Sequence, residues 1–284
     1  MQDIKDIKKR IKSVQETAQI TKAMELISVS KMHKIDGKYQ KNINYYEQLR
    51  EVIKNIIKYS GKADHPYLQE RPGKRTVFLV VAGDTGLAGD YNHKILNYAV
   101  KRVAEAKQKR IYTIGQMSYR FFVEQGIKPD AQFLYCAQNP SLEDARRITA
   151  YMLDLFDDDK TDEVNVIFTA SRGNTGVPQT LRLLPLNKSY FFEEDTKHYI
   201  EPMRFEPSPK EVFDILVPQY VIGIMYNALL QAVRCEHLER MLTMNTATNN
   251  ADKMLSELEL DYNRTRQGRI TTEIIEIVSG KREG

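Results

Sequence analysis

Apolar residues near the start of the chain recur at alternating spacings of three and four, at Ile4, Ile7, Ile11, Val14 and Ala18. This period predicts the seam of a coiled coil. Residues 3–59 hold no proline and one glycine, and residues 238–280 hold no proline and one glycine before the last residue. A helix of roughly 55 residues would be about 80 Å long. Such a helix exceeds a compact domain, so we expect the two terminal segments to pair as an antiparallel coiled coil.

The predicted seam becomes polar after Ala18. The rhythm meets Thr21 and Glu25, and the apolar residues shift to Ile20, Met24 and Ile27. On the C-terminal segment, asparagines and threonines occupy most of residues 245–250, where a self-sufficient coiled coil carries leucines. We therefore expect this part to be weakly paired or covered by another protein.

Between the two ends the period changes to that of an α/β domain. Residues 76–82 form a continuous apolar run ended by Gly83, typical of a strand buried on both faces. Helical and strand patterns then alternate, which predicts a mostly parallel sheet with helices packed over it. The expected elements are a helix at 92–107, a strand at 110–114, a helix at 117–124, a strand at 131–135, a helix at 141–156 and a strand at 163–169. The predicted domains are an N-terminal coiled-coil helix over 1–60, the α/β domain over 74–195, and a C-terminal helix over 208–284 that pairs with the first.

The C-terminal helix has a marked beginning at Ser208. The serine stands at the N-cap, Pro209 at the first helical position and Glu211 three residues after the cap. Pro218 follows about two turns later, and its ring removes one backbone hydrogen bond. We expect a kink or break there, with the main helix starting near Gln219.

Two glycine-rich segments lie in the middle of the chain. Residues 83–89 follow the first strand with the spacing G-x-x-G-x-x-G, whereas a dinucleotide fingerprint needs G-x-G-x-x-G. Tight turning explains these glycines without a ligand, and the same holds for Gly173 and Gly176, which we expect in a loop.

Motifs that carry catalysis or metal binding are missing from the sequence. The five histidines show neither H-E-x-x-H nor a metal-ligand spacing with cysteine, and there is no Walker A loop and no G-x-S-x-G. The acidic run at 157–159 is expected to be solvated. We therefore predict no cofactor, no metal and no catalytic residues.

The charge is nearly balanced, with 42 basic and 38 acidic residues, so a dedicated nucleic-acid binder is not indicated. Cys136 and Cys235 lie far apart in segments of different character, which favours free thiols in a reducing compartment. No run approaches the roughly 18 uninterrupted apolar residues of a membrane span. The first residues are too charged for a signal sequence.

The terminal segments resemble the gamma subunit of F-type ATP synthases. The N-terminal motif is I-K-S-V-Q-E-T-A-Q-I-T-K-A-M at 11–24, continued by S-K-M at 30–32. F-E-P-S-P at 205–209, Y-N-R-T-R-Q at 262–267, I-T-T-E at 270–273 and E-I-V at 276–278 follow in the order of that family. The resemblance implies an antiparallel coiled coil of the terminal helices with a central Rossmann-like α/β domain.

The same resemblance implies partners and a mechanical role. The chain would be the rotor of the central stalk, threading a hexamer of alpha and beta subunits and turned by a membrane ring of c subunits, with an epsilon-type subunit beside it. It would be non-catalytic and peripheral at the cytoplasmic face of a bacterial membrane, held there through the complex only. The positions that match the family's contacts with beta or its coupling residues are Met24, Arg240, Arg266, Gln267, Thr271 and Glu273.

The central loop departs from the family. The family's D-R-G-L-C-G-x-x-N is matched here with Thr85 for the arginine, Ala88 for the cysteine and Asp90 for a glycine. An inserted redox segment with two nearby cysteines, known in the photosynthetic branch, is missing, so thiol control of rotation is not expected.

Two other hypotheses stay open on the sequence. One is an α/β nucleotide-binding enzyme with helical arms, which would bind a small ligand at residues 83–89. The other is a basic coiled coil that binds nucleic acid through the lysines and arginine of residues 5–12, with an affinity that falls steeply with salt. Neither explains the long polar helix at the C-terminus.

Overall fold

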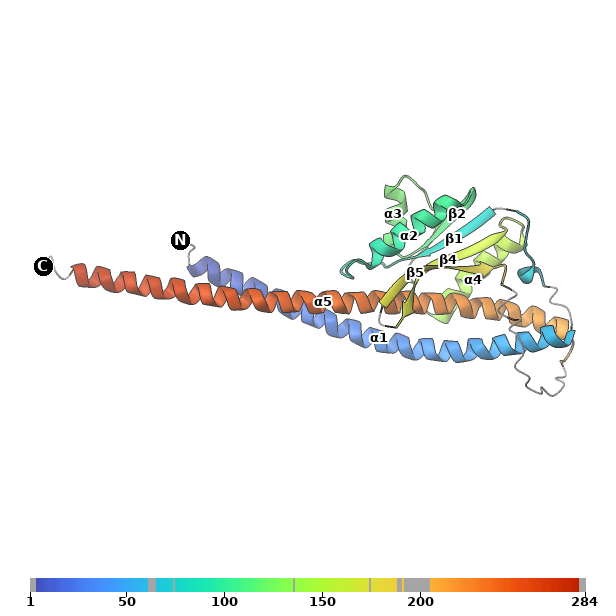
Figure 1. Ribbon diagram of the computed structural model, residues 1–284, viewed down its shortest axis with the longest axis horizontal. Helices are drawn as coiled ribbons and strands as arrows, with labels where there is room; N and C mark the ends of the chain where they lie inside the picture. The colour runs from blue at the N-terminus through green and yellow to red at the C-terminus, as the bar shows by residue number, and fades with distance from the viewer. Residues whose placement is uncertain are drawn as a thin grey trace. The chain divides into compact units, whose positions relative to one another are not determined.

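The computed structural model (Figure 1) describes residues 4–60, 65–73, 75–134, 136–173, 175–187, 191 and 205–280. Its longest elements are α1 (Ile4–Ser60) and α5 (Pro209–Gly280), helices of 57 and 72 residues. The chain divides into two compact units, Met1–Val29 with Arg240–Gly284 and Ser30–Glu239. Each long helix therefore contributes one end to each unit.

A five-stranded sheet lies in the unit Ser30–Glu239, in the order β3-β2-β1-β4-β5. Its strands are β1 (Arg75–Val81), β2 (Gln108–Ile114), β3 (Ala131–Phe133), β4 (Glu163–Arg172) and β5 (Thr175–Leu184). The first four are parallel to one another, and β5 pairs antiparallel with β4. The predicted mostly parallel sheet is confirmed.

Both faces of the sheet are covered. Successive residues of β1 alternate between two cores: Val77, Leu79 and Val81 belong to one, and Phe78 and Val80 to the other. On the second face lie α2 (Tyr91–Glu105) and α3 (Gln116–Glu124). The first face is covered by α4 (Leu142–Asp157) and by the parts of α1 and α5 that belong to this unit. The short helix η1 (Pro66–Leu68) adds buried Tyr67 and Leu68 to the same core.

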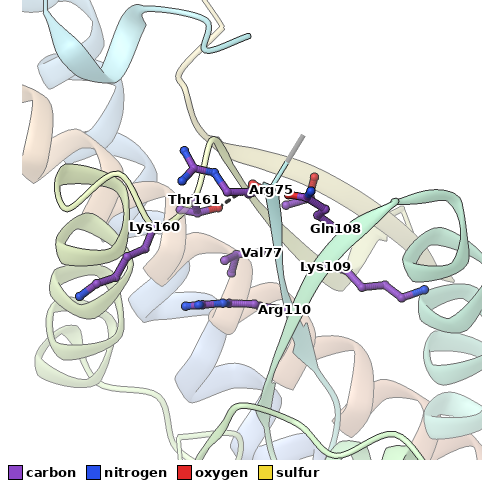
Figure 2. Close-up of a pocket in the computed structure, with 8 residues that line it drawn as sticks. Arg75, Val77, Gln108, Lys109, Arg110, Lys160 and Thr161 are labelled. Carbon is purple, nitrogen blue, oxygen red and sulfur yellow. Dashed lines mark hydrogen bonds between the residues drawn. The ribbon is translucent and has the colours of Figure 1, made fainter. Parts of the chain in front are cut away.

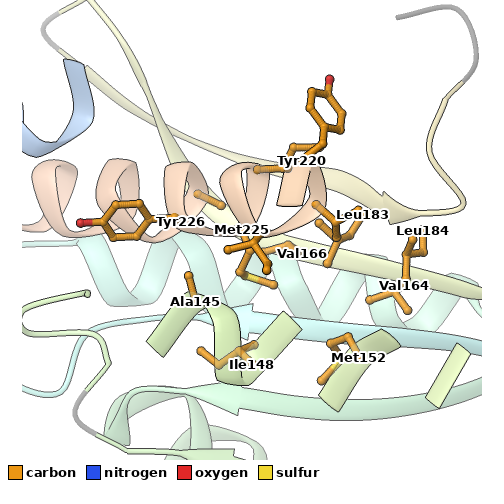
Figure 3. Packing of buried hydrophobic residues seen from close by; sticks show 14 of the residues in the cluster. Ala145, Ile148, Met152, Val164, Val166, Leu183, Leu184, Tyr220, Met225 and Tyr226 are labelled. Carbon is orange, nitrogen blue, oxygen red and sulfur yellow. The ribbon is translucent and has the colours of Figure 1, made fainter. Parts of the chain in front are cut away.

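The core on the first face joins three layers. Figure 3 shows Ala145, Ile148 and Met152 of α4 below Val166 of β4, with Met225 of α5 pointing into the same interior. All five side chains are completely buried. Because apolar side chains fully removed from water each contribute about 1.5–3 kcal/mol, this core holds the helices on the sheet.

The elements expected between residues 92 and 169 are all present, with ends shifted by a few residues. The serine cap of α5 is confirmed, because the backbone N–H of Glu211 donates to Ser208 Oγ at 3.3 Å and that hydroxyl donates to Glu211 Oε1 at 2.9 Å. Ser141 and Asp144 form a capping box on α4.

The strand β5 was not predicted from the sequence, and a loop at Gly173 and Gly176 was expected instead. Gly173 does lie in the turn between β4 and β5, with φ of +60°, but Gly176 is inside β5. A Cβ at Gly176 would lie 2.8 Å from Thr169 Cγ2 on β4 and 3.2 Å from Cys235 Cβ on α5, so both neighbours crowd this position. The strand contains Pro178 and stays half-buried, as an edge strand allows, which hid its pattern.

The predicted break at Pro218 is wrong. The helix α5 runs without interruption from Pro209 to Gly280, with Pro218 inside it. Its neighbours Val217, Tyr220 and Val221 are completely buried. Packing of this turn in the core therefore offsets the missing N–H, since tertiary contacts can override local propensity.

Within the described part of the chain, one helix is long and apolar enough to cross a membrane, judged by length and composition alone. It is α5, where an 18-residue window between Pro209 and Ile277 has a mean hydropathy of 1.4. Of that window, 61% is buried inside the fold, which is the behaviour of a core helix.

Candidate functional site

The N-terminal part of α1 pairs with the C-terminal part of α5 in an antiparallel register. Lys8 Nζ lies 5.5 Å from the centre of the Tyr262 ring. The Thr21 and Thr248 hydroxyls are 2.8 Å apart, and Asn245 Nδ2 donates to Glu25 Oε1 at 3.4 Å. Residues later in α1 therefore contact residues earlier in α5. The predicted antiparallel coiled coil is confirmed.

The seam of this pair keeps its heptad rhythm through polar residues. On α1, Thr21 is 9% and Ser28 1% exposed, and both occupy positions at which the spacing of three and four continues. Ser28 Oγ donates to the Met24 carbonyl at 2.8 Å, so the buried hydroxyl is satisfied within its own helix. The shift of the seam to Ile20 and Ile27 that the sequence suggested is wrong.

The apolar residues that do not enter the seam face outward. Ile20, Leu26 and Ile27 are 61%, 58% and 55% exposed. They surround Met24 in sequence, and Met24 itself is half-buried. This outward group is not predicted from the sequence, because its apolar residues also fit a shifted seam. The signal for it was the polar residues at the heptad positions.

The polar stretch of α5 is likewise divided between two faces. Met244 and Ala251 are buried and Thr248 half-buried between them, at spacings of four and three. Asn245 and Asn249 are exposed and joined by a hydrogen bond of 3.1 Å. The seam on this helix is therefore made of small and flexible residues, and the asparagines belong to the outer face.

Beyond Ile4, the first described residue of α1, α5 continues with no other helix of the described residues beside it (Figure 1). Because Lys8 lies opposite Tyr262, the first described residue of α1, Ile4, falls opposite the region of Arg266. The remaining turns to Gly280 lie past the pair. They carry large apolar side chains that are 47–68% exposed: Ile270, Ile274, Ile275 and Ile277.

The six residues matched to the family fall into two groups. Met24 and Arg240 lie near the limit of the unit Met1–Val29 with Arg240–Gly284, where Met24 is half-buried and Arg240 8% exposed. The other four are exposed on the free end of α5: Arg266, Gln267, Thr271 and Glu273. Along the helix axis Arg240 and Arg266 are about 40 Å apart.

Two hydrogen bonds within the helix involve three of these four residues, Gln267, Thr271 and Glu273. Thr271 Oγ1 donates to the Gln267 carbonyl at 2.9 Å, and Arg269 Nε donates to Glu273 Oε1 at 3.0 Å. These are exposed contacts within one helix, which contribute little to stability. Their side chains can therefore exchange these contacts for a partner at small cost.

The loop at residues 83–89 is filled by side chains of its own chain. Asn92 Oδ1 accepts from the Gly83 N–H at 2.9 Å, and the N–H of Gln116 donates to Asp84 Oδ1 at 3.0 Å. A Cβ at Gly83 would lie 3.1 Å from the Glu236 carboxyl of α5. The glycine is therefore explained by the close approach of α5. Burial raises the pKa of the Asp84 carboxyl, and its hydrogen bond from the Gln116 N–H opposes this shift.

A cleft of about 310 Å³ lies at the amino ends of the parallel strands, away from the loop at residues 83–89. It is lined by the first residues of β1 and β2 (Figure 2). Its basic residues include Arg75, whose guanidinium binds both carboxylate oxygens of buried Asp162 at 2.9 and 2.6 Å. Ligands of open parallel sheets bind at the carboxyl ends of the strands. The cleft is at the amino ends, so it does not correspond to a Rossmann nucleotide site.

Comparisons with known proteins agree along the whole chain. A family model described as ATP synthase matches residues 3–282. The ATP synthase gamma chain of Caldanaerobacter subterraneus subsp. tengcongensis is 39% identical, with 97% of this chain and 98% of the relative covered. The gamma chain of Acetivibrio thermocellus is 36% identical, with 99% and 98% covered.

Solved structures share the fold at low identity. The rotor of the Euglena gracilis mitochondrial ATP synthase in rotational state 1 aligns with a TM-score of 0.60 at 14% identity, covering 94% of this chain and 98% of that chain. The central stalk and c-ring structure from Tetrahymena thermophila contains a chain that aligns at 0.59 with 20% identity, covering 80% and 99%. The predicted fold class and the resemblance read from the terminal motifs are both confirmed. The chain therefore belongs to the ATP synthase gamma-chain family, as a subunit of the central rotor stalk that is not catalytic by itself.

Proposed function

We propose that this chain couples ion-driven rotation of a membrane ring of c subunits to conformational cycling of catalytic beta subunits, in ATP synthesis or hydrolysis. The observation that carries the proposal is the free end of α5. Its isoleucines are 47–68% exposed and lie past the start of α1, where the chain offers no second helix among its described residues. A group of exposed isoleucines on one helix end is typical of a surface that another protein covers.

The proposed mechanism depends on the uneven surface of the helix pair. A rotor changes the nucleotide affinity of beta only if its contacts differ in free energy between the states of beta. The outward group at Ile20, Leu26 and Ile27 occurs on α1, and asparagines face outward on α5. Turning such a shaft presents different chemistry to each beta subunit in sequence.

We assign the contact with beta and the coupling role to Met24, Arg240, Arg266, Gln267, Thr271 and Glu273. Met24 lies among exposed apolar residues of α1, which supports a contact between this surface and beta. Arg266 is exposed on the free end, and its planar fork suits a carboxylate. Arg240 is buried, so we assign it to support of the helix pair beneath the contact surface.

The proposed partners are a hexamer of alpha and beta subunits, an epsilon-type subunit and the c-ring. The relatives named above are bacterial, and the solved relative from Tetrahymena is described with a central stalk and c-ring. We accordingly place the chain at the cytoplasmic face of a bacterial cell membrane, peripheral and held through the complex. In this arrangement residues 1–60 and 208–284 act as the shaft and residues 74–195 as the α/β domain that it carries.

Co-expression of this chain with alpha and beta subunits tests the proposal. We expect one copy per hexamer by size exclusion, with ATPase activity that depends on the chain. Removing residues 266–284 should abolish ATP-driven ion pumping in the complete complex. Pumping and hydrolysis unchanged by this deletion, or a chain that elutes alone and binds a nucleotide, would contradict the proposal.

A further inference from the structure

Three elements of the unit Ser30–Glu239 meet at the side chain of Arg234 on α5. Its Nε donates to Asp36 Oδ1 on α1 at 2.6 Å, and its Nη1 donates to Ser171 Oγ on β4 at 2.6 Å. The Arg234 side chain is 22% exposed. One guanidinium therefore joins both long helices and the sheet.

A second contact holds the same end of β4. The backbone N–H of Ser171 donates to Gln231 Oε1 at 3.2 Å, and Gln231 lies one turn before Arg234 on the same face of α5. Gln231 is itself oriented by Asn227, whose Oδ1 accepts from Gln231 Nε2 at 3.3 Å. Ser171 is thus fixed through both its backbone and its side chain.

These contacts lie near the limits of their unit. The unit begins at Ser30, and Asp36 lies less than two helical turns after it. The unit ends at Glu239, and Arg234 lies little more than one turn before it. Both α1 and α5 continue beyond these limits. Any torque that passes from the sheet into the two helices leaves this unit close to Arg234.

Directional bonds matter at such a place. The apolar core resists separation of the helices from the sheet, but the hydrophobic effect is non-directional. The rigid fork of a guanidinium fixes the direction of each charge-assisted bond. A lysine, with a single ammonium on a flexible stem, would not hold two partners in fixed directions.

We infer that Arg234 is a positioning residue that clamps α1, α5 and β4 together, so that torque received by the sheet reaches both helices of the shaft. The inference rests on the proposed rotor function. The clamp consists of Arg234, Asp36, Ser171 and Gln231. It makes the shaft torsionally stiff where the helices leave the sheet.

The test is a rotation assay on the immobilised complex of this chain with alpha and beta subunits. A gold rod is attached to Cys introduced by Glu124→Cys, an exposed position on α3. The native cysteines are buried, so the label is directed to the new site. The readout is the variance of the rod angle during catalytic dwells, which rises as torsional stiffness falls. Dwell times are recorded alongside it.

In Arg234→Ala we expect the variance to rise about twofold or more, because two charge-assisted bonds are lost. Dwell times should stay unchanged, because the residues assigned to beta lie elsewhere. Arg234→Lys should give a smaller rise. Arg146→Ala is the matched control, since Arg146 pairs with Glu143 within α4 alone, and its variance should equal that of the parent.

If Arg234→Ala fails to fold, Asp36→Asn weakens the α1 contact while the bond to Ser171 remains, and its variance should also rise. A parent rod that turns with ATP, together with clamp variants whose variance matches the parent, would overturn the inference and leave the rotor function standing. A parent rod that does not turn would overturn the proposed function, and the inference with it.

Discussion

At the residue scale, an ion pair between two strands shows how a buried carboxylate is held in this chain. The pair is Arg75 and Asp162. Asp162 is 5% exposed, and the Arg75 guanidinium and backbone N–H hold the pKa of its carboxyl below the usual value. A Cβ at Gly73 would collide with the Asp162 carboxylate, so glycine suits this position. The pair fixes the start of β1 to the turn before β4.

Asp162→Asn should lower the free energy of unfolding at neutral pH. A carboxyl with a lowered folded pKa contributes stability above its unfolded pKa of about 3.9, and that contribution is lost as the pH falls through the folded pKa. The difference between parent and variant should therefore be large at pH 7 and shrink below pH of about 4. Urea unfolding at both pH values measures it. Asp158→Asn, at an exposed pair with Lys160, is the control, and a difference independent of pH would contradict the account.

Arg266→Ala should weaken the binding of the chain to the alpha-beta hexamer. Loss of a hydrogen bond to a charged group costs about 1.5–3 kcal/mol, which corresponds to roughly a tenfold or greater fall in affinity. Dissociation of labelled chain from the hexamer provides the measurement. Arg264→Ala is the matched control, since Arg264 is 79% exposed and lies 4.0 Å from Asp261 of its own helix. Equal effects of both variants would argue against a specific role of Arg266.

At the element scale, the two long helices illustrate how context decides what a local signal means. The serine cap of α5 acts as its sequence predicts, because capping involves only neighbouring residues. The proline at 218 does not end the helix, because completely buried Val217 and Tyr220 hold that turn in the core. Local rules are therefore reliable at exposed ends and weaker inside a core.

Pro218→Ala should raise the free energy of unfolding by about 1 kcal/mol or more, because the new N–H can complete the helical hydrogen bond that proline removes. Chemical denaturation of the Ser30–Glu239 unit within the full chain, followed by tyrosine fluorescence, provides the measurement. Gln219→Ala, at the next position of the same turn, serves as control. A loss of stability would contradict this account.

The hydroxyl pair of Thr21 and Thr248 sets the register of the terminal helices. Thr21→Val or Thr248→Val alone should destabilise the pair by about 1 kcal/mol, since the bond between the helices is lost and the remaining hydroxyl keeps only a carbonyl of its own helix, Ala18 for Thr21 or Met244 for Thr248. Replacing both should cost less than the sum. Hydrogen exchange of amides 10–29 in the four proteins reports this. Strictly additive costs would mean that the hydroxyls do not interact.

At the scale of the whole molecule, the chain leaves part of its surface for other proteins. The end of α5 has exposed isoleucines and, past Ile4 of α1, no helix beside it within the described residues. A single helix in water is only marginally stable. This end therefore depends on its complex for order.

Amides of residues 267–280 should exchange rapidly in the isolated chain and at least about tenfold more slowly in the complex with alpha and beta subunits. The amides of β1 and β4, inside the sheet, serve as the internal reference and should stay protected in both. Protection of residues 267–280 in the isolated chain would show that the free end is already covered.

The sequence by itself determined the terminal helices, the alternating α/β middle and the family, because long periods and terminal motifs are local and repeat many times. It could not determine that β5 is a strand, since a half-buried edge strand with a proline carries a weak pattern. Nor could it decide which apolar residues of α1 enter the seam. Ile20 and Ile27 are the more apolar, yet Thr21 and Ser28 are buried, because the position of the partner helix decides burial. The Arg234 clamp likewise joins residues far apart in sequence, and only tertiary structure brings them within bonding distance.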